Sequence, residues 1–136
     1  MKILIACSKQ FYDKIPQIKE ELEKMGYTTL LPNSYGDAGA EVRHHEMGKE
    51  VHAKWKGEKL RESEKKIKEV DAILVLNFEK NGVPNYIGGA TFLEMYDGFR
   101  MGKKIYLYNE IPEGMLKDEI LAFDPIIIYQ DISQIR

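Results

Sequence analysis

The chain has 136 residues, which suits one domain and is enough to bury a core without disulfides. Its net charge of −2 gives no reason to expect nucleic acid as a partner, and its single cysteine, Cys7, excludes an internal disulfide framework and a multi-cysteine zinc site. No apolar run approaches membrane-spanning length, and the short apolar run at residues 1–7 is followed by charge at Lys9. We therefore expect a cytoplasmic protein with no membrane partner.

The first half of the chain predicts two strands and two or three helices. Apolar runs rich in β-branched residues predict strands at 2–7 and 27–31, and apolar residues at helical spacing predict a helix between them that ends at Gly26. Residues 41–70 carry many charges of both signs, with apolar residues three to five apart. This pattern predicts one or two amphipathic helices broken near Gly57.

The second half begins with a strand at 72–76, whose apolar character at every position is typical of a strand covered on both faces. The elements expected after it are a helix at 90–101, a strand at 104–108, a helix at 113–123, a strand at 125–129 and a last helical turn at 131–135. Such alternation predicts one α/β domain over residues 1–136. It is a flavodoxin-like three-layer sandwich whose five-stranded parallel sheet has the order 2-1-3-4-5.

This strand order also predicts where a ligand binds. Ligands lie beyond the carboxyl ends of the strands where the order reverses, here between the first and third strands. The two loops at that point cover residues 7–13 and 77–89. Ser8 and Tyr12 in the first loop are candidates for ligand contacts. Asn77, at the start of the second loop, is either a ligand contact or a turn former.

Glu94 is the candidate catalytic group. We expect it in the first turn of its helix, where the helix dipole favours an ionised carboxylate. Gly88 and Gly89 precede it and can hold a phosphate or a sugar hydroxyl on their backbone amides. An ionised, partly desolvated carboxylate beside a cleft is what covalent catalysis at a sugar carbon requires. The alternative is a surface glutamate that caps its own helix.

Neither a metal nor another cofactor is expected. His45 and His52 are two helical turns apart, which is too far for two ligands on one short helical face. The lysines around Trp55 alternate with glutamates, as on a solvated helix face, so nucleic-acid binding stays a minor alternative. The glycine-rich motifs of dinucleotide-binding and P-loop proteins do not occur.

Three segments carry a family pattern: Asp71-Ala-Ile-Leu-Val-Leu-Asn77, Asn85-Tyr-Ile-Gly-Gly-Ala-Thr-Phe-Leu-Glu94 and Gly102-Lys-Lys-Ile-Tyr-Leu107. Together they resemble the nucleoside 2-deoxyribosyltransferase-like family, which includes N-glycosidases of deoxynucleotides. The resemblance implies that Glu94 is the nucleophile, that Asp71 takes part in handling the base, and that Asn85 belongs to the substrate-binding loop. It also implies a nucleoside or nucleotide substrate and a homo-oligomer. Topology alone places Asp71 at the amino end of its strand, away from the site.

The chain departs from the family pattern around the nucleophile. No acidic residue lies between Glu79 and Glu94. Tyr96 and Gly98 stand where the family has a small residue and an alanine, and Tyr96 is expected to fill part of the sugar pocket. These departures favour an alternative, a catalytically inactive nucleotide-binding protein of the same fold. A third hypothesis is an interaction module that works through residues 41–70.

Overall fold

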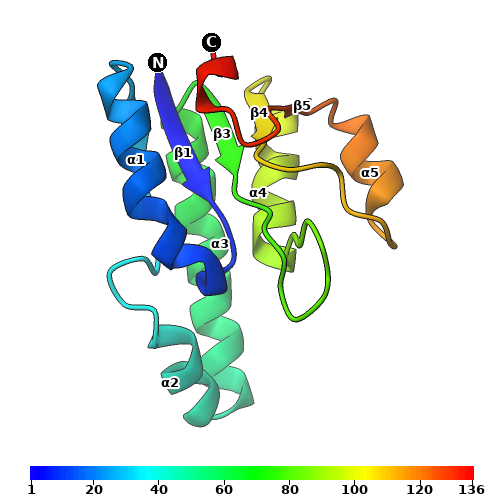
Figure 1. The fold of residues 1–136 in the computed structure, drawn as a ribbon. Coiled ribbons are helices and arrows are strands. Elements are labelled where there is room, and N and C mark those ends of the chain that lie inside the picture. Colours follow the sequence, from blue (N-terminus) through cyan, green and yellow to red (C-terminus); the bar gives the residue numbers. More distant parts are fainter.

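The structure, a computed structural model, describes residues 1–136 and contains a five-stranded parallel sheet in the predicted order β2-β1-β3-β4-β5 (Figure 1). The strands are β1 (Lys2–Ala6), β2 (Thr28–Leu30), β3 (Ala72–Val75), β4 (Lys104–Leu107) and β5 (Ile126–Ile127). The helices are α1 (Ile15–Lys24), α2 (Ala40–Glu46), α3 (Lys49–Glu69), α4 (Gly89–Arg100) and α5 (Lys117–Ala122), with 3-10 turns η1 (Lys9–Lys14) and η2 (Ile132–Gln134). No helix has both the length and the apolar character needed to cross a membrane.

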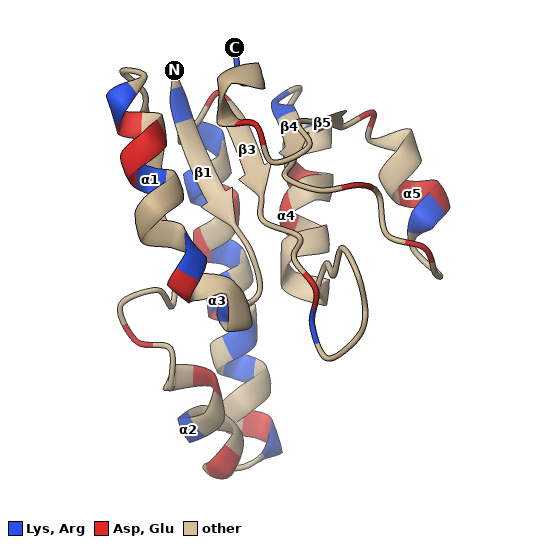
Figure 2. Cartoon of the chain, viewed as in Figure 1, with Lys and Arg blue, Asp and Glu red and all other residues tan.

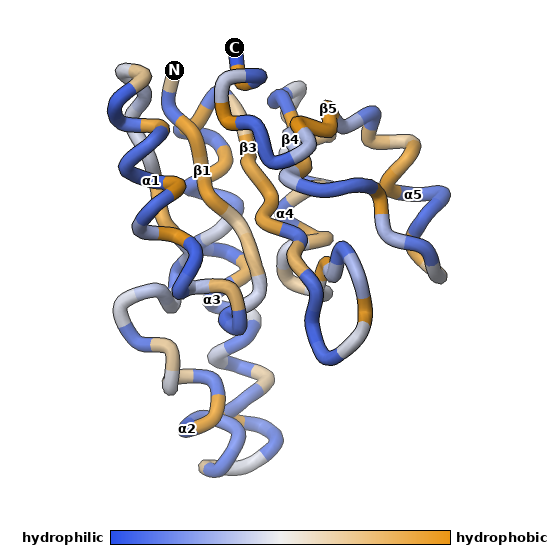
Figure 3. The backbone as a smooth tube through the Cα atoms, in the orientation of Figure 1, coloured by the Kyte–Doolittle hydropathy of each residue, from blue (hydrophilic) through white to orange (hydrophobic).

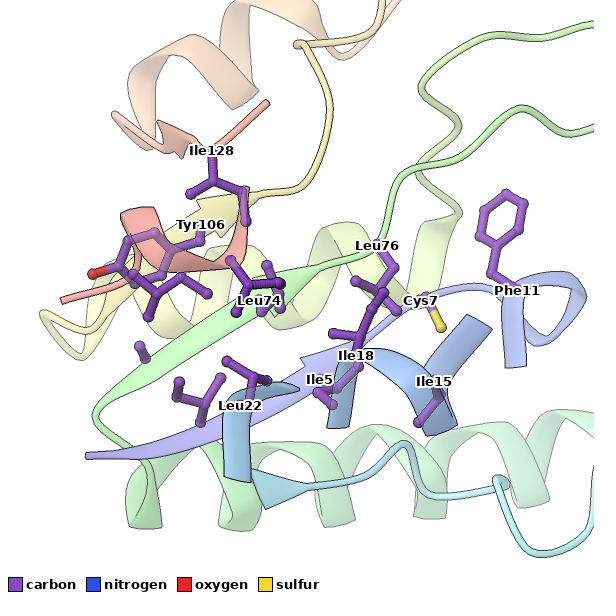
Figure 4. Close-up of a cluster of buried hydrophobic side chains, with 14 residues drawn as sticks. Ile5, Cys7, Phe11, Ile15, Ile18, Leu22, Leu74, Leu76, Tyr106 and Ile128 are labelled. Atoms are coloured by element: carbon purple, nitrogen blue, oxygen red, sulfur yellow. The ribbon is translucent and has the colours of Figure 1, made fainter. Parts of the chain in front are cut away.

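Helices cover both faces of the sheet, as predicted for a three-layer sandwich. Successive strand residues point to opposite faces, so Ile5 and Leu74 pack toward α1 and η2 (Figure 4), whereas Leu4 and Ile73 pack toward α3, α4 and α5. The central strands β1 and β3 are accordingly hydrophobic along most of their length (Figure 3). Burying each such side chain contributes about 1.5–3 kcal/mol, and this stabilises β1 beside β3. The position of the two strands defines the edge of the sheet where a ligand site is expected.

The predicted break near Gly57 is wrong. Helix α3 continues through Gly57, and the chain instead breaks at Gly48, whose φ of 122° lies in the left-handed region that glycine favours. Glycine inside a helix costs only about 1 kcal/mol relative to alanine, so the packing of α3 on the sheet can override it. Helix α2 and the first half of α3 extend beyond the sheet (Figure 1), and charges of both signs run along α3 (Figure 2).

The last elements are shorter than predicted. Strand β5 is only Ile126–Ile127, and the chain turns soon after it because Tyr129 and Gln130 have φ values of 49° and 65°. Helix α5 begins later than expected, after Gly114 with its φ of 132°. These differences affect the far edge of the sheet and leave β1 and β3 unchanged.

Candidate active site

A cavity of about 340 Å³ opens at the carboxyl edge of the sheet. Its walls come from the loops after β1, β2 and β3, from the start of α4 and from one face of α3. The predicted residues that line it are Ser8, Tyr12, Gly88, Gly89 and Glu94. The cavity therefore lies at the edge that the strand order predicted, and five of the eight candidate residues line it.

Glu94 lies in the second turn of α4, not in the first as expected, because the helix already begins at Gly89. The helix has no side-chain cap, so Glu94 does not cap it. The dipole acts weakly at this position, since its effect falls off within the first turn. Burial raises the pKa of Glu94 to about 7, against the lowering effects of a hydrogen bond from Ser63 and the charge of Lys66. The carboxyl group therefore holds its proton to a higher pH than an exposed glutamate does.

Ser63, a buried residue of α3, connects Glu94 to the loop after β2. The Asn33 Nδ2 donates to Ser63 Oγ and to the Lys59 carbonyl oxygen, both at 2.9 Å. Because Ser63 Oγ accepts from Asn33, its single proton remains available for the carboxylate of Glu94.

Lys66 places a positive charge near Glu94. Its Nζ donates to the Leu31 carbonyl oxygen at 2.6 Å, and its side chain is partly buried between α3 and the end of β2. Burial lowers the pKa of Lys66, while the nearby charges of Glu94 and Glu62 raise it. The positive charge of the amine favours the ionised form of Glu94, so it limits how far burial raises the pKa of the carboxyl group.

Tyr12 and Cys7 stay protonated at neutral pH. Burial is the main cause that raises the pKa of Tyr12, and the charge of Glu94 adds to it. The Tyr12 ring packs edge-on against Tyr35, with centroids 5.6 Å apart, so its phenol is held at the cavity wall as a hydrogen-bond donor. Burial also raises the pKa of Cys7 to about 12, which makes it a poor nucleophile. Ser8 also lines the cavity, where its hydroxyl donates to Gln10.

Asp71 and Asn77 do not line the cavity. Asp71 lies at the amino end of β3, where its carboxylate accepts from the Lys2 backbone amide at 2.7 Å. The resemblance implied contact with the base, and this position does not provide it. Asn77 is fully buried, and its Nδ2 donates to the carbonyl oxygens of Asn109 and Glu110 at 3.1 and 2.9 Å. It joins the ends of β3 and β4, so it is neither a ligand contact in this cavity nor a turn former within its own loop.

Asn85 also lies outside this cavity. It has a φ of 57° and lines a second cavity of about 300 Å³ near the ends of β4 and β5, formed by five residues.

The position of Tyr96 differs most clearly from the expectation. It lies on the outer face of α4, with 45% of its surface exposed and its ring beneath the Arg100 guanidinium. It therefore does not fill any part of the cavity.

The sequence did not point to the α3 and β2-loop residues of the cavity, which include Asn33, Trp55, Lys56, Lys59 and Ser63. The α3 members recur at helical spacing, but charged residues occur all around that helix, so spacing does not identify the inward face. The histidines nearby make local contacts, among them the stack of His44 on Trp55 at 5.1 Å. No cluster of His, Cys, Asp or Glu side chains is arranged to hold a metal ion.

A scan against known protein families finds no match to the chain, and a search of curated proteins finds none either. The functional assignment therefore depends on the cavity and on the groups that line it.

Proposed function

We propose that the protein is an enzyme of N-glycosidic bond chemistry, a nucleoside 2-deoxyribosyltransferase or nucleotide N-glycosidase with Glu94 as its nucleophile. The observation that carries this proposal is the position of Glu94. It lies on the wall of a cavity that also receives Ser8 and Tyr12 from the loop after β1. A cavity of this kind at the reversal of strand order is a favoured ligand position in α/β proteins.

The reaction proceeds in two displacements with retention at the sugar carbon. An ionised oxygen of Glu94 attacks C1′ as the C1′–N bond breaks, and the bonding electron pair leaves with the base, which takes up a proton. Water or a second base then attacks C1′ and releases the carboxylate. Ser63 orients the carboxylate for both displacements, and Lys66 stabilises its charge when it is released. The reaction needs no metal.

Glu94 must be ionised to attack. Because its pKa is raised to about 7, we expect kcat/KM to increase as the pH passes through 7 and to level off above it. The measurement is a pH–rate profile with each of the common nucleosides and their 5′-monophosphates as substrate.

Substitution and trapping test the nucleophile directly. Glu94→Ala should lose measurable turnover while its circular dichroism spectrum is unchanged, and a slow substrate analogue should leave a glycosyl adduct on Glu94 that mass spectrometry locates. The matched control is Glu79→Ala, because Glu79 is exposed and lies outside the cavity. Turnover by Glu94→Ala at the parental rate rejects the proposal.

A second candidate is a nucleotide-binding protein without catalytic activity. It is favoured by the state of Glu41, the other carboxylate in the cavity, whose Oε2 lies 2.9 Å from Lys56 Nζ and 3.3 Å from His52 Nε2. A paired carboxylate is poorly placed to act as a second acid or base. This candidate predicts a thermal shift with a nucleotide and no product.

We also expect a homo-oligomer and a cytoplasmic location. The outer face of α4 exposes Leu93, Tyr96 and Phe99, with 42%, 45% and 48% of their surfaces accessible. Contact with a second copy through this face leaves the cavity open on its other side.

A further inference from the structure

We propose that protonation of His44, His45 and His52 loosens helix α2 from α3 and so opens the part of the cavity wall that α2 provides. The effect goes beyond the proposed function, because it concerns the contact between two helices and does not involve Glu94. It can therefore be tested without turnover.

The three histidines of the chain meet its only tryptophan where α2 contacts α3. His44 of α2 stacks on Trp55 of α3, with ring centroids 5.1 Å apart and an angle of 16° between the planes. His52 lies 6.1 Å from the same ring, and His45 meets His52 edge-on at 5.1 Å. We call these four residues the histidine cluster. Histidine is the side chain that ordinarily changes charge between about pH 5 and pH 8, so this contact is sensitive to that range.

The histidine cluster lies beside the cavity. Trp55 and Glu41 are both lining residues. Glu41 belongs to α2, and its Oε2 lies 2.9 Å from Lys56 Nζ and 3.3 Å from His52 Nε2, which both belong to α3. Glu41 thus joins the two helices at the cavity wall. A movement of α2 away from α3 withdraws this carboxylate from the wall and uncovers the Trp55 ring.

Little apolar burial opposes such a movement. Ala40 is the only buried residue of α2, and Val42 is 48% exposed. Helix α2 extends beyond the sheet (Figure 1), and it is connected to α3 at Gly48, whose φ is 122°. Segments with few buried apolar contacts open at a low cost in free energy. The attachment of α2 therefore depends largely on its polar and aromatic contacts with α3.

The two carboxylates next to the histidine cluster are already paired with cations. Glu41 pairs with Lys56, and Asp37 of the preceding loop pairs with Arg43. The pKa of Asp37 is lowered chiefly by its hydrogen bond with Arg43, and the charge of His44 also lowers it. New positive charge on the histidines therefore finds no unpaired carboxylate among these neighbours.

The remaining charged neighbours are mostly positive. Those that the contacts of the cluster and the turn at Gly48 bring near it are Lys9, Lys49, Lys56, Lys59 and Glu46. Lys56 Nζ and Lys59 Nζ each lie 6.0 Å from the centroid of the Trp55 ring. Protonated histidines repel these amines and one another, because like charges at such short distances are unfavourable.

Two attractive effects of protonation do not reverse this balance. A charged His52 binds Glu41 more strongly, but it competes with Lys56 for the same oxygen, Oε2. A charged His44 is attracted to the face of the Trp55 ring, which the amine of Lys56 already approaches. Repulsion therefore outweighs attraction, and acid favours the state in which α2 has moved away from α3.

The test follows the accessibility of Trp55 in the Glu94→Gln protein, in which residue 94 does not titrate. Acrylamide is a neutral quencher of tryptophan fluorescence, and its Stern–Volmer constant is compared at about pH 8 and about pH 5. We expect this constant to increase about twofold or more at the lower pH, while the circular dichroism spectrum stays that of the folded protein. The protein with His44→Gln, His45→Gln and His52→Gln together should show no increase.

Hydrogen exchange gives a second measurement that needs no histidine variant. After correction for the intrinsic effect of pH on exchange, residues 40–47 should lose protection in acid, and residues 60–69 should keep it.

Two substitutions on α2 complete the test at about pH 8. Glu41→Gln should increase the quenching constant already at this pH, because it removes the charged partner of Lys56 and His52. The matched control is Glu46→Gln, since Glu46 is exposed, lies on the same helix and has no ion pair. It should leave the constant unchanged.

The inference is overturned if the quenching constant is the same at both pH values, or if it increases equally in the triple histidine variant. Equal loss of protection in residues 40–47 and 60–69 also overturns it, as does a Glu41→Gln protein that behaves like Glu46→Gln. The reaction fails separately. Opening that depends on the histidines, in a protein without turnover, rejects the reaction and keeps the opening. Turnover through Glu94 without opening in acid does the reverse.

Discussion

Glu94 is half-buried and partly desolvated, which has a cost in stability. Its carboxyl group has lost much of its hydration, and the hydrogen bond from Ser63 together with the charge of Lys66 offsets only part of this loss. Enzymes commonly hold a reactive group in such an unfavourable state, because a group that is fully satisfied in the free protein has little to gain from the substrate. Under the proposed function, the protonation state of Glu94 links stability to activity.

Glu94→Gln should stabilise the fold at alkaline pH. The pKa of Glu94 rises from its ordinary value of 4.5 to about 7 on folding, so its contribution to stability is fully present below pH 4.5 and is lost as the pH rises through 7. Glutamine does not titrate. We therefore compare the free energies of unfolding of the variant and the parent. Their difference should be about 1–3 kcal/mol larger, in favour of the variant, at alkaline pH than at acid pH. Urea unfolding across this range measures the difference.

The control for this prediction is Glu79→Gln, because Glu79 is exposed. Its effect on the free energy of unfolding should be small and independent of pH. If Glu94→Gln changes the free energy of unfolding by the same amount below and above pH 7, the result contradicts the raised pKa of Glu94. It then also contradicts the expected pH–rate profile.

Helix α3 determines the shape of the site at the scale of elements. Its inner face contributes Trp55, Lys59 and Ser63 to the cavity, and its packing against α4 brings Ser63 to Glu94. Helix α4 in turn lies close to the sheet at Gly98, where a Cβ atom would come within 2.5 Å of Ile73 Cδ1. This close approach explains why Gly98 occupies a position where the family resemblance implied alanine.

Gly57→Ala should stabilise the protein. Gly57 lies inside α3 without a positive φ, and a Cβ atom there would meet only the Arg61 side chain, at 3.8 Å. Alanine restricts the unfolded chain and favours the helix, so we expect a gain of about 0.5–1 kcal/mol in the free energy of unfolding. Thermal and urea unfolding measure it.

The control for Gly57→Ala is Gly48→Ala, which should destabilise because the φ of Gly48 is 122°. A loss of stability in Gly57→Ala would show that α3 is interrupted at this position after all.

At the scale of the whole molecule, the apolar outer face of α4 is the feature that the folded chain leaves uncovered. Phe99→Glu should convert the expected homo-oligomer into a monomer, because it places a charge within the apolar contact. Light scattering after size exclusion gives the mass. Met115→Glu, at an apolar residue that is 92% exposed and outside α4, should leave the mass unchanged. A monomeric parent, or a folded Phe99→Glu variant of unchanged mass, contradicts assembly through this face.

Local sequence patterns were sufficient to predict the strand order and the edge that carries the cavity. The apolar run of β3 needs cover on both faces, and the alternation of strands with helices allows few parallel arrangements. The loop that contains Ser8 and Tyr12, together with Gly88 and Gly89, was placed correctly for the same reason, since backbone topology alone brings these segments together.

Side-chain direction and long-range packing were decided only by the tertiary structure. Asn77 follows β3 directly, yet it turns inward because the carbonyl groups of Asn109 and Glu110 offer it hydrogen bonds. Tyr96 is two residues from Glu94 and points away from the cavity, since successive helical residues diverge by about 100°. The sequence by itself thus determined the fold and the edge of the sheet that carries the cavity. The partners of Glu94, Ser63 and Lys66, come from α3, and Asn33 of the loop after β2 contacts Ser63. These segments meet α4 only once the chain has folded.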